Sequence, residues 1–424
     1  MIGDGNGGRH GDAPQALLII QNLHVPFDRR VWLECQTLRD EGWGVTVVCP
    51  RGPDSRPHEV IDGVEVFTYR PYAPGGGAVG FLLEYLYSFA ATLWLVLRAR
   101  RKRGAFEVLQ ACNPPDIFWP IARLLRWRDG TRFLFDHHDL CPELYESRFG
   151  RKGDLAHRGL LLLERATFRT ADAVTSTNES YARIARERGA KRDKDVTVVR
   201  TGPDPDKLRP VAAVAGRRQR HRFLVAYLGV MGPQDGVDLA LSAAAYLVNE
   251  RGRDDIAFTF MGSGDCWPDL VAERDRLGLQ DHVEFTGRVP DDTVTEVLST
   301  ADIGLCPDPK NPLNDVSTMN KTMEYMAFAL PVVAFDLHET AVSARDAAAY
   351  APANDVTAFA DLVVTLLDDP VRRTAMGKAG RERVLEHLAW EHQQAGYLAA
   401  FAALLERGAH ASRVRAGGAS LAEG

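Results

Sequence analysis

The sequence predicts an α/β protein with two doubly wound domains that face a central crevice. Short apolar runs alternate with longer amphipathic stretches along most of the chain, which is the pattern of parallel strands joined by helices. The 424 residues are 45% hydrophobic and 25% charged, enough material for two domain-sized cores. A proline-rich segment at 200–210 interrupts the alternation and predicts a linker between the domains.

This linker divides the chain into two domains flanked by tails. We expect a disordered N-terminal tail over residues 1–15, a first domain over 16–203 and a second domain over 204–390. A C-terminal helix at 391–407 is expected to cross back to the first domain. The small, polar segment 408–424 is expected to be disordered.

The first half begins with a buried strand at 16–20, a polar loop and an amphipathic helix at 31–41 that Gly42 ends. An apolar run at 45–48 completes one strand–helix–strand unit. The remaining expected strands lie at 63–69, 107–110, 131–135, 173–176 and 196–199, and the remaining helices at 81–103 and 154–170.

The same alternation restarts after the linker, so the second half is expected to form its own parallel sheet. The expected strands lie at 223–228, 256–261, 283–286, 303–305 and 332–335. The expected helices lie at 237–250, 267–277, 291–299, 319–328 and 356–367. Ligands of such sheets bind beyond the carboxyl ends of the strands.

Charge and cysteine patterns argue against several classes of protein. The net charge is −6, and basic residues outnumber acidic ones only in the first half, so nucleic acid is not an expected partner. The six cysteines are scattered without a C-x-x-C pair, which argues against a disulfide scaffold and a zinc site. Residues 1–14 lack the apolar run of a secretory signal, so the expected compartment is the cytoplasm.

Residues 317–333 combine a polar loop, a helix start and a buried strand. Amides at a helix N-terminus favour a phosphate, and Lys321 adds a full positive charge beside it. Glu324 lies one turn further along, where its carboxylate can accept hydrogen bonds from vicinal sugar hydroxyls. The pattern is equally typical of a capped helix with a solvated Lys–Glu pair, and spacing alone does not separate the two.

Two loops at strand ends carry further candidates. Residues 136–139 (Asp-His-His-Asp) follow a predicted strand, and an imidazole there can donate or accept a proton near neutral pH. The alternative is a loop histidine bonded to the backbone. The loop after the first strand carries His24, Asp28 and Arg29, and Asp28 is equally suited to cap the helix that follows.

The serial order of these segments resembles that of the family-four retaining glycosyltransferases, which have the GT-B fold of two Rossmann-like domains. The segments that carry the resemblance are 31–50, 135–143, 227–238, 260–264, 283–290, 301–307 and 317–333. The resemblance implies transfer of a sugar from a nucleotide diphosphate sugar to an acceptor hydroxyl with retention, in cell-surface polysaccharide or glycoconjugate biosynthesis. It implies no cofactor, no obligatory metal, and a glycan, lipid-linked or small-molecule acceptor.

The same resemblance implies roles for individual residues. His138, Asp139, Lys321 and Glu324 take the catalytic positions, with His138 reaching the donor sugar and Glu324 binding the donor ribose. The acceptor-side residues are His24, Asp28 and Arg29. The donor-binding residues are Gly229, Gly232, Gly262, Gly264, Arg288, Val289, Asp315, Ser317, Thr318, Asn320 and Glu324.

Three positions depart from the family pattern. The family has two glutamates eight positions apart, and the first falls on Val316, with Asp315 adjacent as a substitute. An arginine and a lysine that hold the donor diphosphate correspond here to Val230 and Asp235. The groups left to neutralise the diphosphate are Lys321, amides near Gly229 and Gly232, and Arg200 or Arg288.

Two other functions stay open. A nucleotide-sugar epimerase on the same architecture would need additional carboxylates in the crevice. A degenerate, non-catalytic protein that binds a membrane or a partner transferase would account for Val230, Asp235 and Val316. A measurement of nucleotide-sugar binding distinguishes this non-catalytic protein from the two enzymes, because a protein that has lost those cations should bind the donor poorly.

Residues 81–97 are almost wholly apolar and run into the basic segment 98–103. Glu84 and Ser88 interrupt the apolar run, which is short for a membrane span. One interpretation is a helix buried in the first domain. The other is an interfacial helix on anionic lipid, which would make the protein peripheral at the inner face of the membrane.

Overall fold

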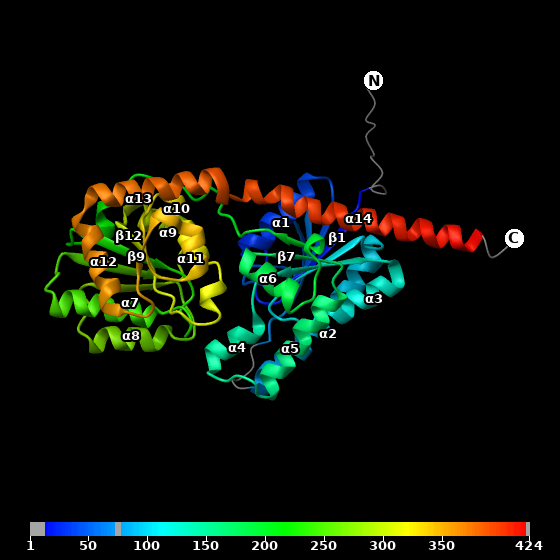
Figure 1. Cartoon of the computed structure of the whole chain (residues 1–424), viewed down its shortest axis with the longest axis horizontal. Helices are drawn as coiled ribbons and strands as arrows, with labels where there is room; N and C mark the ends of the chain where they lie inside the picture. Colours follow the sequence, from blue (N-terminus) through cyan, green and yellow to red (C-terminus); the bar gives the residue numbers. More distant parts are fainter. Residues whose placement is uncertain (1–12, 73–77, 421–424) are drawn as a thin grey trace, which may run out of the picture. The chain divides into compact units, whose positions relative to one another are not determined.

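The computed structural model describes residues 13–72 and 78–420 and contains two compact units, each built on one sheet (Figure 1). The first unit comprises the chain up to Pro142, Gly153–Val199 and the chain from Gln394 onward. The second comprises Glu143–Lys152 and Arg200–Gln393. The division at Val199 falls close to the expected boundary at residue 203, whereas the assignment of 143–152 to the second unit was not predicted.

The sheet of the first unit has eight strands in the order β3-β4-β2-β1-β5-β6-β7-β8. All neighbours are parallel except β3 and β4, which form an antiparallel pair. The strands are β1 (Gln15–Ile19), β2 (Gly44–Pro50), β3 (His58–Ile61), β4 (Val64–Tyr69), β5 (Val108–Cys112), β6 (Arg132–His137), β7 (Ala173–Ser176) and β8 (Val196–Val198). The helices are α1 (Arg29–Asp40), α2 (Ala78–Arg103), α3 (Trp119–Asp129), α5 (Leu155–Thr170), α6 (Glu179–Glu187) and, from Gln394 onward, α14 (Trp390–Ser420). Most of α4 (Cys141–Phe149) belongs to the second unit.

The sheet of the second unit has six parallel strands in the order β11-β10-β9-β12-β13-β14. The strands are β9 (Phe223–Leu228), β10 (Ile256–Met261), β11 (Val283–Gly287), β12 (Ile303–Cys306), β13 (Val332–Phe335) and β14 (Ala348–Ala351). The helices are α7 (Val237–Ala245), α8 (Trp267–Arg276), α9 (Asp291–Thr300), α10 (Asn320–Ala327), α11 (His338–Ala344), α12 (Val356–Asp368) and α13 (Pro370–Arg383).

Alternate residues of the central strand β9 enter two separate cores. Phe223, Val225 and Tyr227 pack with residues of α7 and α12 on one face of the sheet. Leu224 and Ala226 pack with residues of α9 and α10 on the other face. Because successive side chains of a strand point to opposite faces, a strand that is apolar throughout must be covered on both sides.

The predicted α/β class and all the predicted strands are confirmed within two residues at each end. The sequence analysis missed β3, a short and partly exposed edge strand, and β14, whose Ala-rich sequence has weak strand propensity. It also missed α13, which is highly charged and has no clear apolar period.

Helix α14 continues through residues 408–420, which the sequence analysis expected as a tail. This segment is rich in alanine and extends a helix that is already nucleated, so each added residue needs only favourable propagation. Residues 1–12 and 421–424, also expected as tails, lie outside the described residues, and Gln15 already belongs to β1.

Each sheet has a point where the strand order reverses. In the first unit it lies between β1 and β5, and in the second between β9 and β12. The loops that follow these strands diverge and leave room for a ligand at the carboxyl edge. The candidate residues after β1, β6, β9 and β10 therefore belong to these two edges.

Gly262 provides a test of the second unit's packing. Its φ of +133° lies outside the range of L side chains, and a Cβ there would lie 1.8 Å from the carbonyl oxygen of Gly229. We expect Gly262→Ala to lower the free energy of unfolding by about 2–4 kcal/mol. Gly216→Ala, with no atom within 4 Å of the added Cβ, is the control for urea denaturation, and equal stability of the two variants would contradict this packing.

Candidate active site

An ion pair buried at the carboxyl end of β6 organises the edge of the first unit. Asp136 is fully buried and accepts hydrogen bonds from Arg30, at 2.7 Å from Nη2 and 3.1 Å from Nε. The Thr175 hydroxyl donates to the same carboxylate at 3.0 Å, and Arg30 Nη1 donates to the Val199 carbonyl at 2.9 Å. Burial opposes ionisation of Asp136, but the charge of Arg30 and the bond from His138 hold its pKa below the ordinary value.

Asp136 also orients His138, one of the predicted catalytic residues. His138 Nδ1 lies 3.4 Å from Asp136 Oδ2, which directs the other ring nitrogen away from the carboxylate. Burial lowers the pKa of His138, but its bond to Asp136 and the charge of Asp136 outweigh burial, so the pKa lies above the ordinary value. The ring is thus held in one orientation and favours its protonated form.

The neighbouring residues have structural roles. His137 is fully buried among Phe135, Phe168 and Tyr181, and burial lowers its pKa to about 3, so it stays neutral. Asp139, the other predicted catalytic residue of this loop, accepts a bond from the amide of Leu140 through its carboxylate.

Asn113 fixes the backbone of the loop that carries His138 and Asp139, and the sequence analysis missed it. Its Oδ1 accepts hydrogen bonds from the amides of His138 and Asp139 at 2.9 and 3.0 Å. Its Nδ2 donates to the Asp139 carbonyl at 2.7 Å. Asn113 directly follows β5, the strand beside the switch point, and this position was the available signal.

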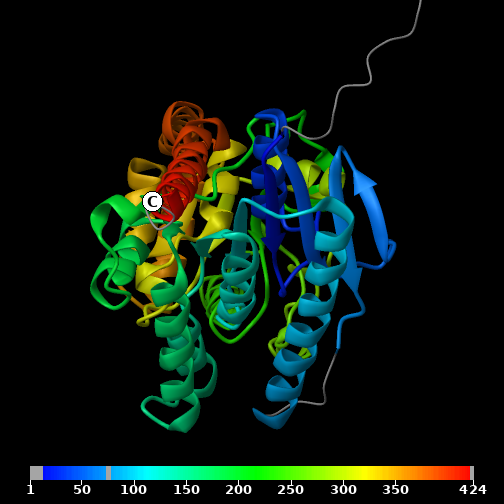
Figure 2. The same ribbon diagram turned by 90° about the vertical axis from the view of Figure 1, so that its right-hand side faces the viewer.

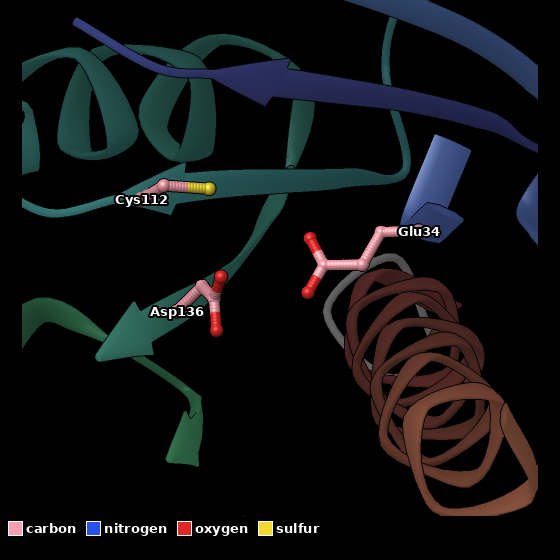
Figure 3. A group of neighbouring side chains, drawn as sticks. All are labelled: Glu34, Cys112 and Asp136. Carbon is pink, nitrogen blue, oxygen red and sulfur yellow. The ribbon is translucent and has the colours of Figure 1, made fainter. Parts of the chain in front are cut away.

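The ion pair extends into a buried polar cluster on α1, β5 and β6 that contains Glu34, Cys112 and Asp136 (Figure 3). Potential ligand atoms of these three side chains lie within 4.8 Å of one another, which is a spacing that could hold a metal ion. The guanidinium of Arg30 pairs with both carboxylates, at 3.2 Å from Glu34 and 2.7 Å from Asp136. Arg30 therefore supplies the positive charge that this cluster requires.

Glu34 links the cluster to the C-terminal helix. Its carboxyl group accepts a hydrogen bond from Gln110 at 2.7 Å, and Gln110 in turn accepts one from Tyr397 of α14 at 2.6 Å. Burial and the nearby charge of Asp136 raise the pKa of Glu34 to about 8, despite the opposing charge of Arg30. Arg30, Glu34 and Gln110 were not predicted, because their roles depend on partners distant in sequence.

The acceptor-side candidates after β1 divide into different roles. Asp28 is buried and caps α1, accepting a hydrogen bond from the Val31 amide at 3.0 Å. The ring of His24 stacks on Phe27 with centroids 5.2 Å apart. Arg29 is exposed, and its neighbour Arg30 is the arginine that turns inward to Asp136.

The predicted glycines of the second unit allow close approach between the loops after β9 and β10. A Cβ at Gly264 would lie 2.5 Å from the Met231 carbonyl oxygen, and Gly262 similarly contacts Gly229. The amide of Gly232 donates to the Asp235 carboxylate at 2.9 Å. Burial raises the pKa of Asp235 to about 6, although the charge of Lys321 opposes this shift.

Helix α10 presents the predicted phosphate-binding end. It begins at Asn320, and its N-cap residue Met319 makes no side-chain cap hydrogen bond. Lys321, however, is largely buried and donates to Asp308 at 2.6 Å, with its amine 5.4 Å from the centre of the Tyr227 ring. A phosphate at this helix end would share the charge of Lys321 with Asp308.

The other donor-side candidates lie around the same edge. Glu324 is half-buried on the second turn of α10. Asp315, the substitute for the first family glutamate, accepts from the His338 amide at 2.9 Å and pairs with Lys310 at 3.3 Å. The Ser317 hydroxyl donates to the Leu313 carbonyl at 2.7 Å, and Thr318 is half-buried in the loop that leads into α10.

Cations near this edge are few and partly committed. Arg288 is exposed and donates to the Ser263 hydroxyl at 3.1 Å, and the adjacent Val289 is half-buried. Arg200 lies 4.0 Å from Glu339. The sequence analysis missed Arg148, which groups with the second unit, pairs with Asp265 and favours the charged form of Asp235.

The raised pKa of Glu34 predicts a measurable pH dependence. Folded Glu34 stays protonated up to about pH 8, whereas the unfolded chain ionises near 4.5, so its contribution to stability is lost as pH rises through this window. We expect Glu34 to lower the free energy of unfolding of the wild-type protein by up to about 1.4 kcal/mol per pH unit in this window, and Glu34→Gln to abolish this dependence. Urea denaturation between pH 5 and 8.5 measures it, with exposed Glu41→Gln as the control. Parallel pH profiles for the wild-type protein and Glu34→Gln would contradict a raised pKa.

Comparison with known proteins assigns both units to one family. The model of the "Glycosyl transferase 4-like domain" matches residues 28–202, and that of "Glycosyl transferases group 1" matches residues 222–369. A GDP-mannose-dependent alpha-(1-6)-phosphatidylinositol monomannoside mannosyltransferase of Mycobacterium tuberculosis is 32% identical over 320 residues, which cover 72% of each chain.

Other relatives are more distant. A 2-deoxystreptamine glucosyltransferase of Streptomyces kanamyceticus is 28% identical over 250 residues, which cover 56% of this chain and 62% of that protein. The structure of a sucrose-phosphate synthase from Thermosynechococcus elongatus shares the fold, with a TM-score of 0.76 and 17% identity over 93% of this chain and 100% of that one. From these matches and the two doubly wound sheets, the chain belongs to the GT-B glycosyltransferases of family four.

Proposed function

We propose that this protein transfers a hexosyl group from a nucleotide diphosphate sugar to an acceptor hydroxyl, with retention of anomeric configuration. The observation that carries the proposal is the N-terminus of α10, which has no side-chain cap and lies at the carboxyl edge of its sheet with Glu324 one turn along the helix. The N-terminus of a helix can bind the negatively charged diphosphate, and a carboxylate one turn further along can accept hydrogen bonds from the ribose hydroxyls.

The donor would be held mainly by backbone and by few charges. The first amides of α10 would take the phosphates beside the loop at Gly229 and Gly232, and Glu324 would take the ribose hydroxyls. The backbone at Arg288 and Val289 would contact the nucleobase. Donor binding through oriented amides costs little free energy of reorganisation, because the helix and the glycine loops are already formed before the donor binds.

The first unit would contribute His138. With Nδ1 turned to Asp136, the second ring nitrogen would act on the transferred sugar. As the bond between the anomeric carbon and the phosphate oxygen breaks, the acceptor oxygen bonds to that carbon from the same face, and the acceptor proton passes to the leaving phosphate. The protein then needs neither a covalent nucleophile nor an obligatory metal, and its task is to position groups and stabilise charge.

The biological role we propose is the synthesis of a cell-surface polysaccharide or glycoconjugate in the cytoplasm. Relatives named for a lipid-linked mannoside and for an aminocyclitol support a glycan, lipid-linked or small-molecule acceptor. Family membership weighs against the epimerase and the non-catalytic alternatives. Product analysis distinguishes them, because an epimerase would act on the donor without acceptor and a non-catalytic protein would yield no product.

Thermal unfolding with nucleotide sugars tests the donor site. A donor at about 100 times its dissociation constant should stabilise the protein by about 2.7 kcal/mol, and Glu324→Ala should lose most of this effect. Glu386→Ala, which alters an exposed glutamate of the same unit, is the control and should respond as the wild-type protein does. If Glu324→Ala responds equally to every donor tested among the UDP, GDP, ADP and dTDP sugars, then Glu324 is not a donor ligand.

Asp235 should oppose donor binding when it is ionised. Its carboxylate lies in the loop that would receive the phosphates, and its pKa of about 6 predicts tighter donor binding as pH falls through this value. We expect Asp235→Asn, which keeps the acceptor for the Gly232 amide, to bind donor about 3- to 10-fold more tightly at pH 7.5 by calorimetry. Asp238→Asn, an exposed change of equal charge, should leave affinity unchanged, and weaker binding by Asp235→Asn would show that Asp235 assists the donor.

A further inference from the structure

The outward face of α2 carries an apolar stripe that ends in arginines. Leu82, Leu86 and Trp94 recur at helical spacing and are 58%, 59% and 60% exposed. Arg98 continues the same stripe, with its guanidinium 5.6 Å from the centre of the Trp94 ring, and exposed Arg101 follows. Along this stripe the leucines come first, then the tryptophan, then the arginines. A helix face that reaches from the hydrocarbon of a membrane to its charged headgroups has the same order.

The inward face of α2 is less apolar than its outward face near the N-terminal end. Ser88 and Thr92 are buried, and Glu84 accepts a hydrogen bond from Gln21 at 2.9 Å. A helix that served only the protein core would place its leucines inward and its polar residues outward. Phe89 and Leu93 pack on the core, but Leu82 and Leu86 stay exposed, which indicates that these leucines have another environment.

This helix is the one segment of the described residues that is long and apolar enough to cross a membrane by length and composition. In its most apolar window 28% is buried, so much of this window lies outside the core of the first unit. Its C-terminal half is nevertheless anchored, because Leu95, Val96 and Ala99 belong to the core of the first unit. The intact fold therefore allows α2 to lie on a membrane surface and not to span it.

Helix α5 of the same unit carries a matching face. Leu155 and Leu162 are 86% and 67% exposed. Arg158, Arg165 and Arg169 share this side of the helix at the same helical spacing and are also exposed. The acidic residue within α5, Glu164, is buried and paired with Arg188, so the outward face is apolar and basic.

The two helices project on the same side of the first unit. Figure 2 shows the N-terminal turns of α2 and of α5 extending beyond the end of the sheet in the same direction, and Figure 1 shows the same projection in a view turned by 90°. The exposed leucines of both helices lie toward these projecting ends. A flat apolar phase could therefore be contacted by α2 and α5 together.

We propose that the outward faces of α2 and α5 dock this protein on an anionic lipid bilayer. Among the described residues no carboxylate pairs with Arg98, Arg101, Arg158, Arg165 or Arg169, so these charges are available to phosphate headgroups. A second copy of the chain would bring two basic faces together and is disfavoured by repulsion, whereas anionic lipid complements both the charge and the leucines. The proposal rests on the first unit alone and does not depend on sugar transfer.

Flotation of the full-length protein with lipid vesicles tests the proposal. Phosphatidylcholine vesicles with phosphatidylglycerol should bind the wild-type protein, and pure phosphatidylcholine should bind it far more weakly. The triple variant L82S/L86S/W94S should lose binding to both. The triple variant R158Q/R165Q/R169Q should weaken binding to anionic vesicles on the order of 100-fold, given the usual contribution of each arginine.

Matched controls separate docking from folding and from donor binding. V371S/L385S removes exposed apolar side chains of the second unit and should float as the wild-type protein does. Unaltered thermal unfolding and an unaltered response to nucleotide sugars would show that the stripe variants are folded. Three outcomes would each overturn the proposal: the wild-type protein does not float, all variants float equally, or sedimentation velocity shows a dimer that L82S/L86S/W94S dissociates. None of these outcomes would affect the proposed transferase activity.

Discussion

The buried ion pair between Arg30 and Asp136 is the interaction on which the first unit's site depends. It joins α1 to the end of β6, while Thr175 of β7 and the carbonyl of Val199 complete its hydrogen bonds. Two charges removed from water are stable only when each is fully paired, so the geometry around them has little freedom. His138 takes its orientation from this pair, and the cluster continues through Glu34 and Gln110 to α14.

The second unit relies on a different constraint, the close approach of backbone to backbone. Gly229, Gly262 and Gly264 let two loops pass within distances that no side chain would allow. The amides of Gly229 and Gly262 are bonded to the carbonyls of Met261 and Gly287, and a Cβ at Gly229 would lie 3.2 Å from Lys321 of α10. The charged groups here are nearly balanced, since Asp308 neutralises Lys321 and Asp235 faces Gly232. A donor site of this kind takes its affinity from dipoles and geometry more than from net charge.

The surface of the first unit adds a requirement that neither site explains. A helix packed on a sheet needs apolar residues on its inner side, and α2 supplies them from Phe89 onward. Its projecting half keeps polar residues inward and leucines outward. Retaining exposed leucines costs solubility, so the pattern is best understood together with the basic faces of α2 and α5 as one surface for anionic lipid.

The sequence by itself determined the fold class, the family and every strand except β3 and β14, because these depend on local periodicity and on the serial order of motifs. It also located the two carboxyl edges and the helix that begins at Asn320. Only the tertiary structure decided that Arg30 and not Arg29 turns inward to Asp136, since a rotation of one residue along a helix exchanges a buried position for an exposed one. It alone showed Asn113 holding the loop of His138 and Asp139, and Asp308 neutralising Lys321, because such contacts join residues separated along the chain and follow no local pattern.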